Sequence, residues 1–385
     1  MKKILLVIAA IAIAALVYLV FQFRGAAPTI LPPKLSSPQT TSAVAKNELG
    51  LKIPEGFSID IFANNLDGPR DLVFDDAGNL LASVPSKGRV VAVSNQGEIT
   101  EILASLKRPH GLAFYKGMLY VAQETQVSRY NWNPKSLSAT LDKVLFPLPA
   151  GGRHFTRSIA FKNDGTMFVT IGSTCDVCNE KDPFSAAVIV SDKDGIAPRL
   201  FAKGLRNSVF ITVNGQSQKL WGTEMGRDFL GDNLPPDEIN IIEDNKDYGW
   251  PRCFGDRTVD LKFNSGAGQD ACRDTQPPLY KLCAHCAPLG LTFINSKQFP
   301  EGLQGDLLVA LHGSWNSSKP VGYKVVKLKV NGDKISGEED FISGFLKGAQ
   351  TIGRPADLTF GPDGALYVSD DKAGVIYRLW QNGQN

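Results

Sequence analysis

The chain has 385 residues, of which 43% are hydrophobic and 21% are charged, and these are the proportions of a globular protein with a large core. They exclude a largely disordered chain. The formal net charge is only +2 and no basic stripe follows the N-terminus, so we exclude a nucleic-acid-binding protein. The 37 Gly, 23 Pro and 21 Phe residues, together with short apolar runs, favour an all-β fold of many short strands.

Residues 1–24 are the first predicted element. Lys2 and Lys3 precede an uncharged run from Ile4 to Phe23, which Arg24 ends. A run of this length spans a bilayer as one transmembrane helix, so we expect an N-terminal membrane anchor; a cleaved signal peptide is the alternative. In both cases the lysines stay inside and the rest is exported, which predicts an extracytoplasmic protein held at the membrane through this helix.

A linker and one large domain follow the anchor. Residues 25–48 are rich in Pro, Ser and Thr, a composition that is typical of a flexible linker. We expect residues 49–385 to form the folded domain.

Six segments of this domain share one pattern: a polar residue, a short apolar strand, a turn with Gly, Asp or Asn, and a second apolar strand. Each segment is therefore a predicted β-hairpin. The first strands are centred on Val73, Ala113, Ala160, Val209, Thr292 and Thr359. Because four-stranded blades repeat at roughly 40 to 50 residues, the spacing predicts a six-bladed β-propeller with insertions in the last two gaps. Residues 227–287 then hold an outer hairpin and long loops, and "YKVVKLKV" is an outer strand.

In a propeller of this kind, the starts of the first strands and the ends of the second strands lie on one face, which we call the mouth. Polar residues gather at these positions, and they include all four histidines: Arg70, His110, Gln123, Glu124, His154, Arg157, Ser173, Arg206, Asn207, Glu224, His285, His312, Arg354, Asp370 and Asp371. Polar groups here can simply close the ring, but a concave set with both charge signs favours a ligand site.

Several segments resemble one known family. The chain is similar to the glucose/sorbosone dehydrogenases at "GGRHFTRSIAFKNDGTMFVTIGS", "GLRNS", "LWGTEMGRDFLGDNLPPDEINII", "YGWP" and "GDLLVALHGSW", over about Ile53 to Trp380. Members of that family are six-bladed quinoproteins that use pyrroloquinoline quinone (PQQ) and calcium. The segments "GSTCDVC" and "GRDFLGDNLPPD" look closest to the sorbosone branch. The resemblance implies a PQQ-dependent dehydrogenase that oxidises an aldose or a related sugar aldehyde.

The resemblance also implies roles for individual residues. His154 resembles the family's general base, and an imidazole suits that role because its ordinary pKa lies near neutrality. The side chains expected to face the cofactor are Arg157, Arg206, Asn207, His312 and Arg354. Two positions depart from the glucose enzymes, because Ala356 replaces an arginine and His312 replaces a lysine.

The calcium site is predicted at the end of the fourth blade's second strand. The family offers backbone carbonyls there, which are those of Gly226 and Arg227 in this chain. Asp237 and Glu238 are nearby acidic candidates, since calcium prefers hard oxygen ligands. Trp250 and Trp315 either shape a sugar or quinone site or pack in the core.

Six cysteines in an exported domain favour disulfides. Local pairing joins Cys175 to Cys178, Cys253 to Cys272 and Cys283 to Cys286, but six cysteines permit fifteen connectivities. A four-thiolate zinc site is an alternative for the two CxxC units. Covalent haem is excluded, because neither unit is followed by histidine.

Two further functions stay open for the same fold. One is a metal-dependent lactonase or other hydrolase, in which the metal activates water. The other is a non-catalytic propeller that binds a ligand. For the dehydrogenase, the sequence assigns a small sugar as substrate but leaves the electron acceptor unassigned.

Overall fold

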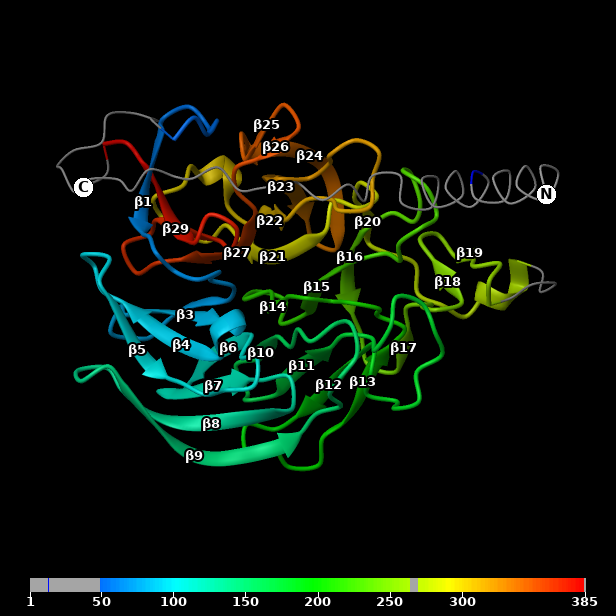
Figure 1. Cartoon of the computed structure of the whole chain (residues 1–385), viewed down its shortest axis with the longest axis horizontal. Helices are drawn as coiled ribbons and strands as arrows, with labels where there is room; N and C mark the ends of the chain where they lie inside the picture. The colour runs from blue at the N-terminus through cyan, green and yellow to red at the C-terminus, as the bar shows by residue number, and fades with distance from the viewer. Residues whose placement is uncertain (1–12, 14–48, 264–268, 384–385) are drawn as a thin grey trace, which may run out of the picture.

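The structure is a computed structural model that describes Ile13 and residues 49–263 and 269–383. It confirms the six-bladed β-propeller: six main sheets surround one axis, and each has at least four strands (Figure 1). Apart from Ile13, the predicted anchor at residues 1–24 and the linker at residues 25–48 lie outside the described residues. Within the described residues, no helix combines the length and the apolar character needed to cross a bilayer.

The first three blades follow each other along the chain. Blade 1 consists of β2 (Leu72–Phe74), β3 (Leu80–Val84), β4 (Arg89–Val93) and β5 (Ile99–Leu103). Blade 2 consists of β6 (Gly111–Tyr115), β7 (Met118–Ala122), β8 (Gln126–Asn133) and β9 (Ser138–Pro147). Blade 3 consists of β10 (Ile159–Phe161), β11 (Met167–Ile171), β12 (Ala187–Ser191) and β13 (Arg199–Lys203), and β17 (Lys246–Asp247) pairs with its outer edge in parallel.

The last three blades carry the insertions. Blade 4 consists of β14 (Ile211–Val213), β15 (Leu220–Glu224), β16 (Glu238–Ile242) and β20 (Tyr280–Lys281). Blade 5 consists of β21 (Pro288–Phe293), β22 (Leu307–Leu311), β23 (Lys324–Asn331) and β24 (Lys334–Ile342). Blade 6 consists of β27 (Pro355–Phe360), β28 (Leu366–Asp370), β29 (Val375–Gln381) and β1 (Phe57–Ala63). The remaining elements are β18 (Cys253–Phe254), β19 (Thr258–Val259), β25 (Leu346–Lys347), β26 (Gln350–Thr351) and the 3-10 turns η1 (Pro85–Lys87), η2 (Gln269–Cys272) and η3 (Glu301–Leu303).

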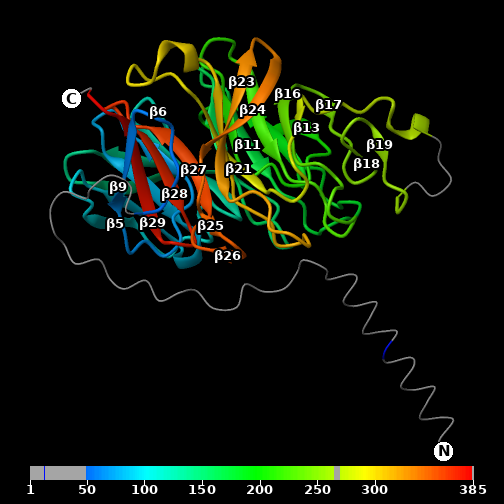
Figure 2. The same cartoon turned by 90° about the horizontal axis from the view of Figure 1, so that it is seen from above.

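The second strand of each blade explains the short apolar runs in the sequence. β3, β11, β15, β22 and β28 are buried along their whole length. Neighbouring blades cover both faces of these strands, so both faces of each strand must be apolar or hydrogen-bonded. The hairpin β18–β19 is different, since it lies at the outer edge of the ring beside blade 4 (Figures 1 and 2).

The ring is closed by a strand that the repeat pattern does not reveal. β1 pairs antiparallel with β29, with Ile59 opposite Leu379, so the start of the domain completes the last blade. Side chains also join neighbouring blades near the axis: the Leu72 amide donates to Asp357 (2.8 Å), and the Leu112 amide donates to Asp71 (3.0 Å). These contacts link blade 6 to blade 1 and blade 1 to blade 2.

One predicted strand position is wrong. The first strand of blade 4 is Ile211–Val213, not a strand centred on Val209. The two residues just before Val209 turn toward a side chain instead of the ladder, because the Asn207 amide and the Ser208 hydroxyl both donate to the Glu224 carboxylate.

The cysteines form the three local disulfides, Cys175–Cys178, Cys253–Cys272 and Cys283–Cys286. The four-thiolate zinc site is therefore wrong, since the two sulfur atoms within each CxxC unit form a disulfide and leave no thiolates to bind zinc.

Candidate active site

A pocket of about 240 Å³ opens at the mouth between blades 3, 4 and 5, and we call it the His154 pocket. It is lined by Arg153, His154, Arg206, Asn207, Met225, Gly226, Asp228, Asp237, His285, Ala287 and Trp315. Five residues that the sequence predicted as catalytic, cofactor-binding or metal-binding meet here: His154, Arg206, Asn207, Gly226 and Asp237. They come from the loop before β10, the loop before β14 and the two ends of the β15–β16 connection.

The tautomer of His154 follows from its contacts. Nδ1 lies 2.8 Å from the Ser173 hydroxyl oxygen and 3.1 Å from the Ser173 carbonyl oxygen. The Ser173 hydroxyl donates its one proton to the Cys175 carbonyl (2.7 Å). Both Ser173 oxygen atoms near Nδ1, the hydroxyl and the carbonyl, are therefore acceptors toward the ring. Nδ1 therefore carries the proton in the neutral ring. No hydrogen bond from the described residues reaches Nε2, whose lone pair is available.

The surroundings of His154 also keep the ring neutral. Burial lowers the pKa of His154 to about 3, and the charges of Arg206 and Arg153 act in the same direction. The neutral ring carries its one proton on Nδ1, so Nε2 can accept a proton across the whole neutral pH range. A general base must be unprotonated, as this ring is, but a pKa so far below neutrality also makes it a weaker base than an ordinary imidazole.

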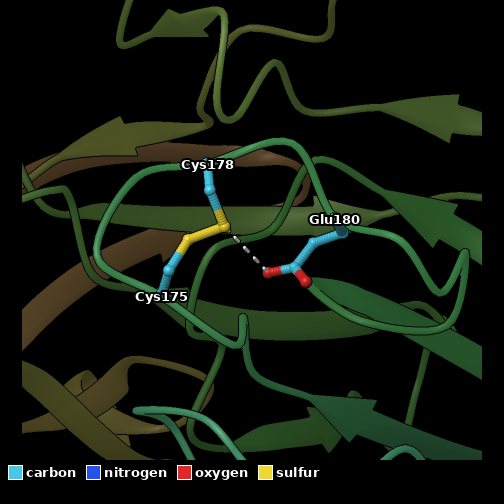
Figure 3. Close-up of side chains that lie close together, drawn as sticks. All are labelled: Cys175, Cys178 and Glu180. Carbon is cyan, nitrogen blue, oxygen red and sulfur yellow. Dashed lines mark hydrogen bonds between the residues drawn. A yellow bond between two sulfur atoms is a disulfide. The ribbon is translucent and has the colours of Figure 1, made fainter.

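The loop after β11 fixes several of these groups. Its disulfide joins Cys175 to Cys178, and Glu180 lies beside it, with its carboxylate 4.0 Å from Cys178 Sγ (Figure 3). Both oxygen atoms of Glu180 accept hydrogen bonds from Thr174, from its amide and its hydroxyl, at 2.7 Å each. Cys175, Cys178 and Glu180 are close enough to hold a metal ion, but disulfide sulfurs are not the thiolates that bind one.

Arg206 is held in a network of opposite charges. Its guanidinium pairs with Asp176 at 2.6 Å and with Asp228 at 3.3 Å, and Arg153 reaches Asp228 at 3.0 Å. Burial raises the pKa of Asp228 to about 6, although the positive charge of Arg206 opposes the shift. Arg206 and Arg153 thus place positive charge at the pocket wall in a fixed orientation.

Asp237 and Gly226 also line the pocket, close to Arg206, whose guanidinium donates to the carbonyl of the neighbouring Met225 at 3.4 Å. The Asp237 carboxylate accepts the amide protons of Gly226 (2.8 Å) and Ala287 (2.7 Å), and the residue is only 3% exposed. Burial raises the pKa of Asp237 to about 7. A buried carboxylate of this kind gains from a nearby cation, which would stabilise its charged form.

The other predicted residues lie outside this pocket. The Arg157 guanidinium is buried and donates to the backbone carbonyls of His154, Thr156 and Pro149. His312 pairs with Asp371 (2.9 Å), and Arg354 donates to the His312 carbonyl (3.0 Å). These two residues form a separate charged cluster nearer blade 6.

The remaining two metal candidates face a different cavity. Arg227 pairs with Asp260 at 2.7 Å, and Glu238 accepts a hydrogen bond from the Gly255 amide at 3.0 Å. Both line a cavity of about 30 Å³, which Trp250 also lines. Asp237 and Glu238 are consecutive, and they line different hollows.

Sequence reasoning missed Arg153, Met225, Asp228 and Ala287, which line this pocket, and Asp176, which pairs with Arg206. Each is next to a residue that was singled out, as Asp176 is inside the CDVC unit and Asp228 follows Arg227. The signal that could have found the two acids is charge balance, because a buried arginine such as Arg206 requires carboxylate partners.

Comparisons with known proteins agree with the fold. The model of the TrAA12-like family matches residues 51–382. A protein of unassigned function from Borreliella burgdorferi is 32% identical over 350 residues, which cover 86% of this chain and 90% of that protein. The pyrroloquinoline quinone-dependent pyranose dehydrogenase of Coprinopsis cinerea is 26% identical over 416 residues, covering 85% of this chain but only 54% of the relative.

One solved structure illustrates the shared fold. The calcium structure of a Trichoderma reesei carbohydrate-active enzyme of family AA12 superimposes with a TM-score of 0.76. Its sequence is 20% identical, and the match covers 89% of this chain and all of that one. The two chains therefore share the propeller fold.

Proposed function

Because the chain belongs to the TrAA12-like family, we propose that it is a PQQ-dependent sugar dehydrogenase that works outside the cytoplasm. The observation that carries the proposal is the neutral His154, whose Nε2 is available in a pocket that also holds Arg206 and Asn207. A base beside cationic and amide donors is what oxidation of an alcohol on an anionic cofactor requires.

The donors in the pocket fit PQQ, which carries three carboxylates. Arg206 brings positive charge to the pocket wall, but its guanidinium already donates to Asp176, Asp228 and the Met225 carbonyl, so a cofactor carboxylate would have to share or displace these partners. Among the described residues, the side-chain amide nitrogen of Asn207 has only the Met225 thioether as partner, at 3.4 Å, and sulfur is a weak acceptor. This amide therefore has donor capacity left for a cofactor oxygen. Arg206 and Asn207 are the residues that would hold the quinone.

The part of the pocket around Asp237 fits calcium. Asp237 supplies a hard oxygen donor whose charged form lacks full compensation, and Gly226 is beside it. Glu238 and Arg227 stay outside this set, because they line only the other cavity, whereas Gly226 lines both. We therefore assign the metal to Asp237 and to the backbone at Gly226.

The chain's own part in the reaction is proton transfer and positioning. When bound, PQQ supplies the hydride acceptor, and calcium acts as a Lewis acid that polarises it. His154 Nε2 takes the proton of the sugar hydroxyl as its C–H bond breaks. The Ser173 oxygens then stabilise the protonated ring through Nδ1–H, and Trp315, which is 44% exposed, offers the sugar an apolar face.

The finer parts of the proposal are the substrate and the location. We propose an aldose or a sorbosone-like sugar aldehyde as substrate, on the strength of the sequence resemblance. The three disulfides support an oxidising, extracytoplasmic compartment. Residues 1–24, as the expected anchor, would then hold the enzyme at the membrane, near its electron acceptor.

The test is reconstitution of the purified protein with PQQ and calcium. We expect aldose-dependent dye reduction and a rise in melting temperature when PQQ is added, because a ligand stabilises the state that it binds. His154→Gln should lower kcat by at least about 100-fold, the usual range for a general base. His285→Gln is the matched control, since Nε2 of His285 is engaged with the Gly231 carbonyl (2.7 Å), and its loss should be far smaller.

Two outcomes would contradict the proposal. One is the absence of both sugar oxidation and PQQ-induced stabilisation. The other is hydrolysis of a lactone by the protein without PQQ, which would favour the metal-dependent hydrolase.

A further inference from the structure

The Cys283–Cys286 disulfide has no part in the proposed chemistry. It lies in the connection between β20 and β21, where the chain passes from blade 4 to blade 5. Ala284 and His285 form a turn, and the disulfide joins the two residues that flank it. We call residues 282–287 the CAHC loop.

One end of this disulfide is open to solvent. All six cysteines lie in the described part of the chain, and Cys283 is the only exposed one among them. Its partner Cys286 is fully buried, and in the Cys253–Cys272 disulfide both residues are buried. A thiolate in solution can therefore approach the sulfur atom of Cys283. Access of this kind is one of the factors that set the rate of thiol–disulfide exchange.

The CAHC loop is hydrogen-bonded to Asp237 at both of its ends. The Leu282 amide donates to the Asp237 carbonyl (2.8 Å), and the Ala287 amide donates to the Asp237 carboxylate (2.7 Å). The disulfide closes the chain between these two hydrogen bonds. When it is opened, the loop samples more conformations, so both hydrogen bonds to Asp237 become weaker.

The backbone of the loop also favours a movement on opening. His285 (φ 64°) and Ala287 (φ 53°) are both left-handed, a conformation that residues other than glycine rarely adopt. Such a backbone persists only where its surroundings hold it, and the disulfide is one of these constraints. Once the disulfide is open, the loop can relax toward ordinary φ values, which turns the Ala287 amide away from Asp237.

This movement reaches the His154 pocket. His285 and Ala287 line the pocket together with Asp237, to which the proposed function assigns the metal. Nε2 of His285 also lies 2.7 Å from the Gly231 carbonyl, in the connection between β15 and β16. A looser CAHC loop therefore leaves Asp237 less well oriented toward a cation.

We propose that the Cys283–Cys286 disulfide is a site of thiol–disulfide exchange that a dithiol reductant opens, and that its opening weakens cofactor binding in the His154 pocket. The exchange site stands on the disulfide alone, and the effect on cofactor binding rests on the proposed function.

The exchange has two steps. A thiolate of the reductant attacks Cys283 Sγ and forms a mixed disulfide, and Cys286 leaves as a thiolate that takes up a proton. The second thiol of the reductant then attacks its own sulfur atom in the mixed disulfide, and Cys283 leaves in the same way. Two electrons pass to the pair of cysteines, and the reductant becomes a disulfide.

Differential alkylation tests the exchange site. The protein is treated with dithiothreitol, quenched with acid, unfolded and alkylated, and each cysteine is followed by mass spectrometry. We expect Cys283–Cys286 to open at least about tenfold faster than Cys253–Cys272, and before Cys175–Cys178, because only its first sulfur atom belongs to an exposed residue. Earlier opening of either of the other disulfides would overturn the inference.

Hydrogen exchange tests the movement of the loop without any cofactor. Cys283→Ser opens the disulfide at its exposed end and keeps Cys286 in the core, and the amides of Leu282 and Ala287 should then exchange faster. Ala284→Ser is the matched control, because it changes the same turn and keeps the disulfide, so both amides should stay protected. Equal protection in the wild type and Cys283→Ser would contradict the proposed loosening.

Calorimetry with PQQ in the presence of calcium tests the effect on the pocket. Cys283→Ser should bind PQQ about tenfold more weakly than the wild type, which corresponds to the loss of one hydrogen bond to a charged group, and Ala284→Ser should match the wild type. Equal affinities of the wild type and Cys283→Ser would overturn this effect. If the wild type binds no PQQ, the proposed function fails, while alkylation and hydrogen exchange still decide whether the disulfide opens and loosens the loop.

Discussion

Ser173 should control the orientation of His154, and Ser173→Ala tests this. The substitution removes two hydrogen bonds of a fully buried hydroxyl, the one from His154 Nδ1 (2.8 Å) and the one to the Cys175 carbonyl (2.7 Å). At about 1 kcal/mol net for each bond, the free energy of unfolding should fall by about 2 kcal/mol. The Ser173 carbonyl still accepts from Nδ1, so the ring keeps one of its two partners.

The effect on catalysis follows from the partner that is left. Loss of one of two acceptors should raise the barrier by about 1.4 kcal/mol, which lowers kcat about tenfold and falls well short of the loss expected for His154→Gln. Ser191→Ala is the matched control, because Ser191 is a buried serine whose hydroxyl donates to the Ile196 carbonyl (3.1 Å) on a hairpin of blade 3 away from the pocket. It should lose stability and keep kcat.

The assay combines turnover with ¹⁵N NMR of the imidazole rings, which is tractable because the chain has only four histidines. In the wild type, His154 should be the Nδ1–H tautomer, and Ser173→Ala should add the Nε2–H tautomer. The reasoning is refuted if the wild-type ring carries its proton on Nε2, or if Ser173→Ala and Ser191→Ala have the same kcat.

Two more predictions concern the ring and the loop. Burial raises the pKa values of Asp357 and Asp71, which titrate as one buried pair, so the folded state binds a proton here more tightly than the unfolded chain does. This contribution to stability is full below about pH 4 and is lost as the pH rises through the raised pKa of the pair. Asp357→Asn should therefore flatten the fall in the free energy of unfolding between pH 5 and pH 8, measured by urea titration, and an unchanged slope would contradict this. Replacing Cys175 and Cys178 by serine should weaken PQQ binding, measured by calorimetry, because it frees Asp176, the partner of Arg206. Replacing Cys253 and Cys272 by serine should lower stability without weakening PQQ binding. Equal PQQ affinities in the two variants would exclude a role of the Cys175–Cys178 disulfide in PQQ binding.

The sequence predicted the blades because each hairpin is a local feature. An apolar strand, a turn and a second apolar strand lie within about 20 residues, and burial between blades imposes that pattern each time. The closing strand β1 was not predictable in this way. Its partner β29 is at the other end of the domain, and pairing such as Ile59 with Leu379 leaves no local signal.

The candidate site divides in the same manner. His154, Arg206 and Asn207 precede first strands, where the propeller geometry alone brings residues to the mouth. The direction of a side chain is another matter. Arg157 is close to His154 in the chain, but its guanidinium turns inward to three backbone carbonyls. That choice depends on which carbonyls the loop leaves unpaired, and the sequence does not encode this in any short pattern.

The loop after β11 connects the two halves of the proposed chemistry. Ser173 holds the base, and Asp176, three residues later, holds the arginine that would grip the quinone. The Cys175–Cys178 disulfide closes the turn that contains Asp176 and begins two residues after Ser173. A change in this loop can therefore act on proton transfer through Ser173 or on cofactor binding through Asp176. The Ser173 hydroxyl contacts the base, and only the backbone amide of Ser173 contacts Arg206, by donating to the Arg206 carbonyl (2.7 Å). Because Ser173→Ala keeps that backbone bond, it should lower kcat while the affinity for PQQ is kept. Opening the disulfide should lower both kcat and the affinity for PQQ. If the two changes differ in this way, the loop positions the base and the arginine independently; if they have the same effect, the loop only shapes the pocket.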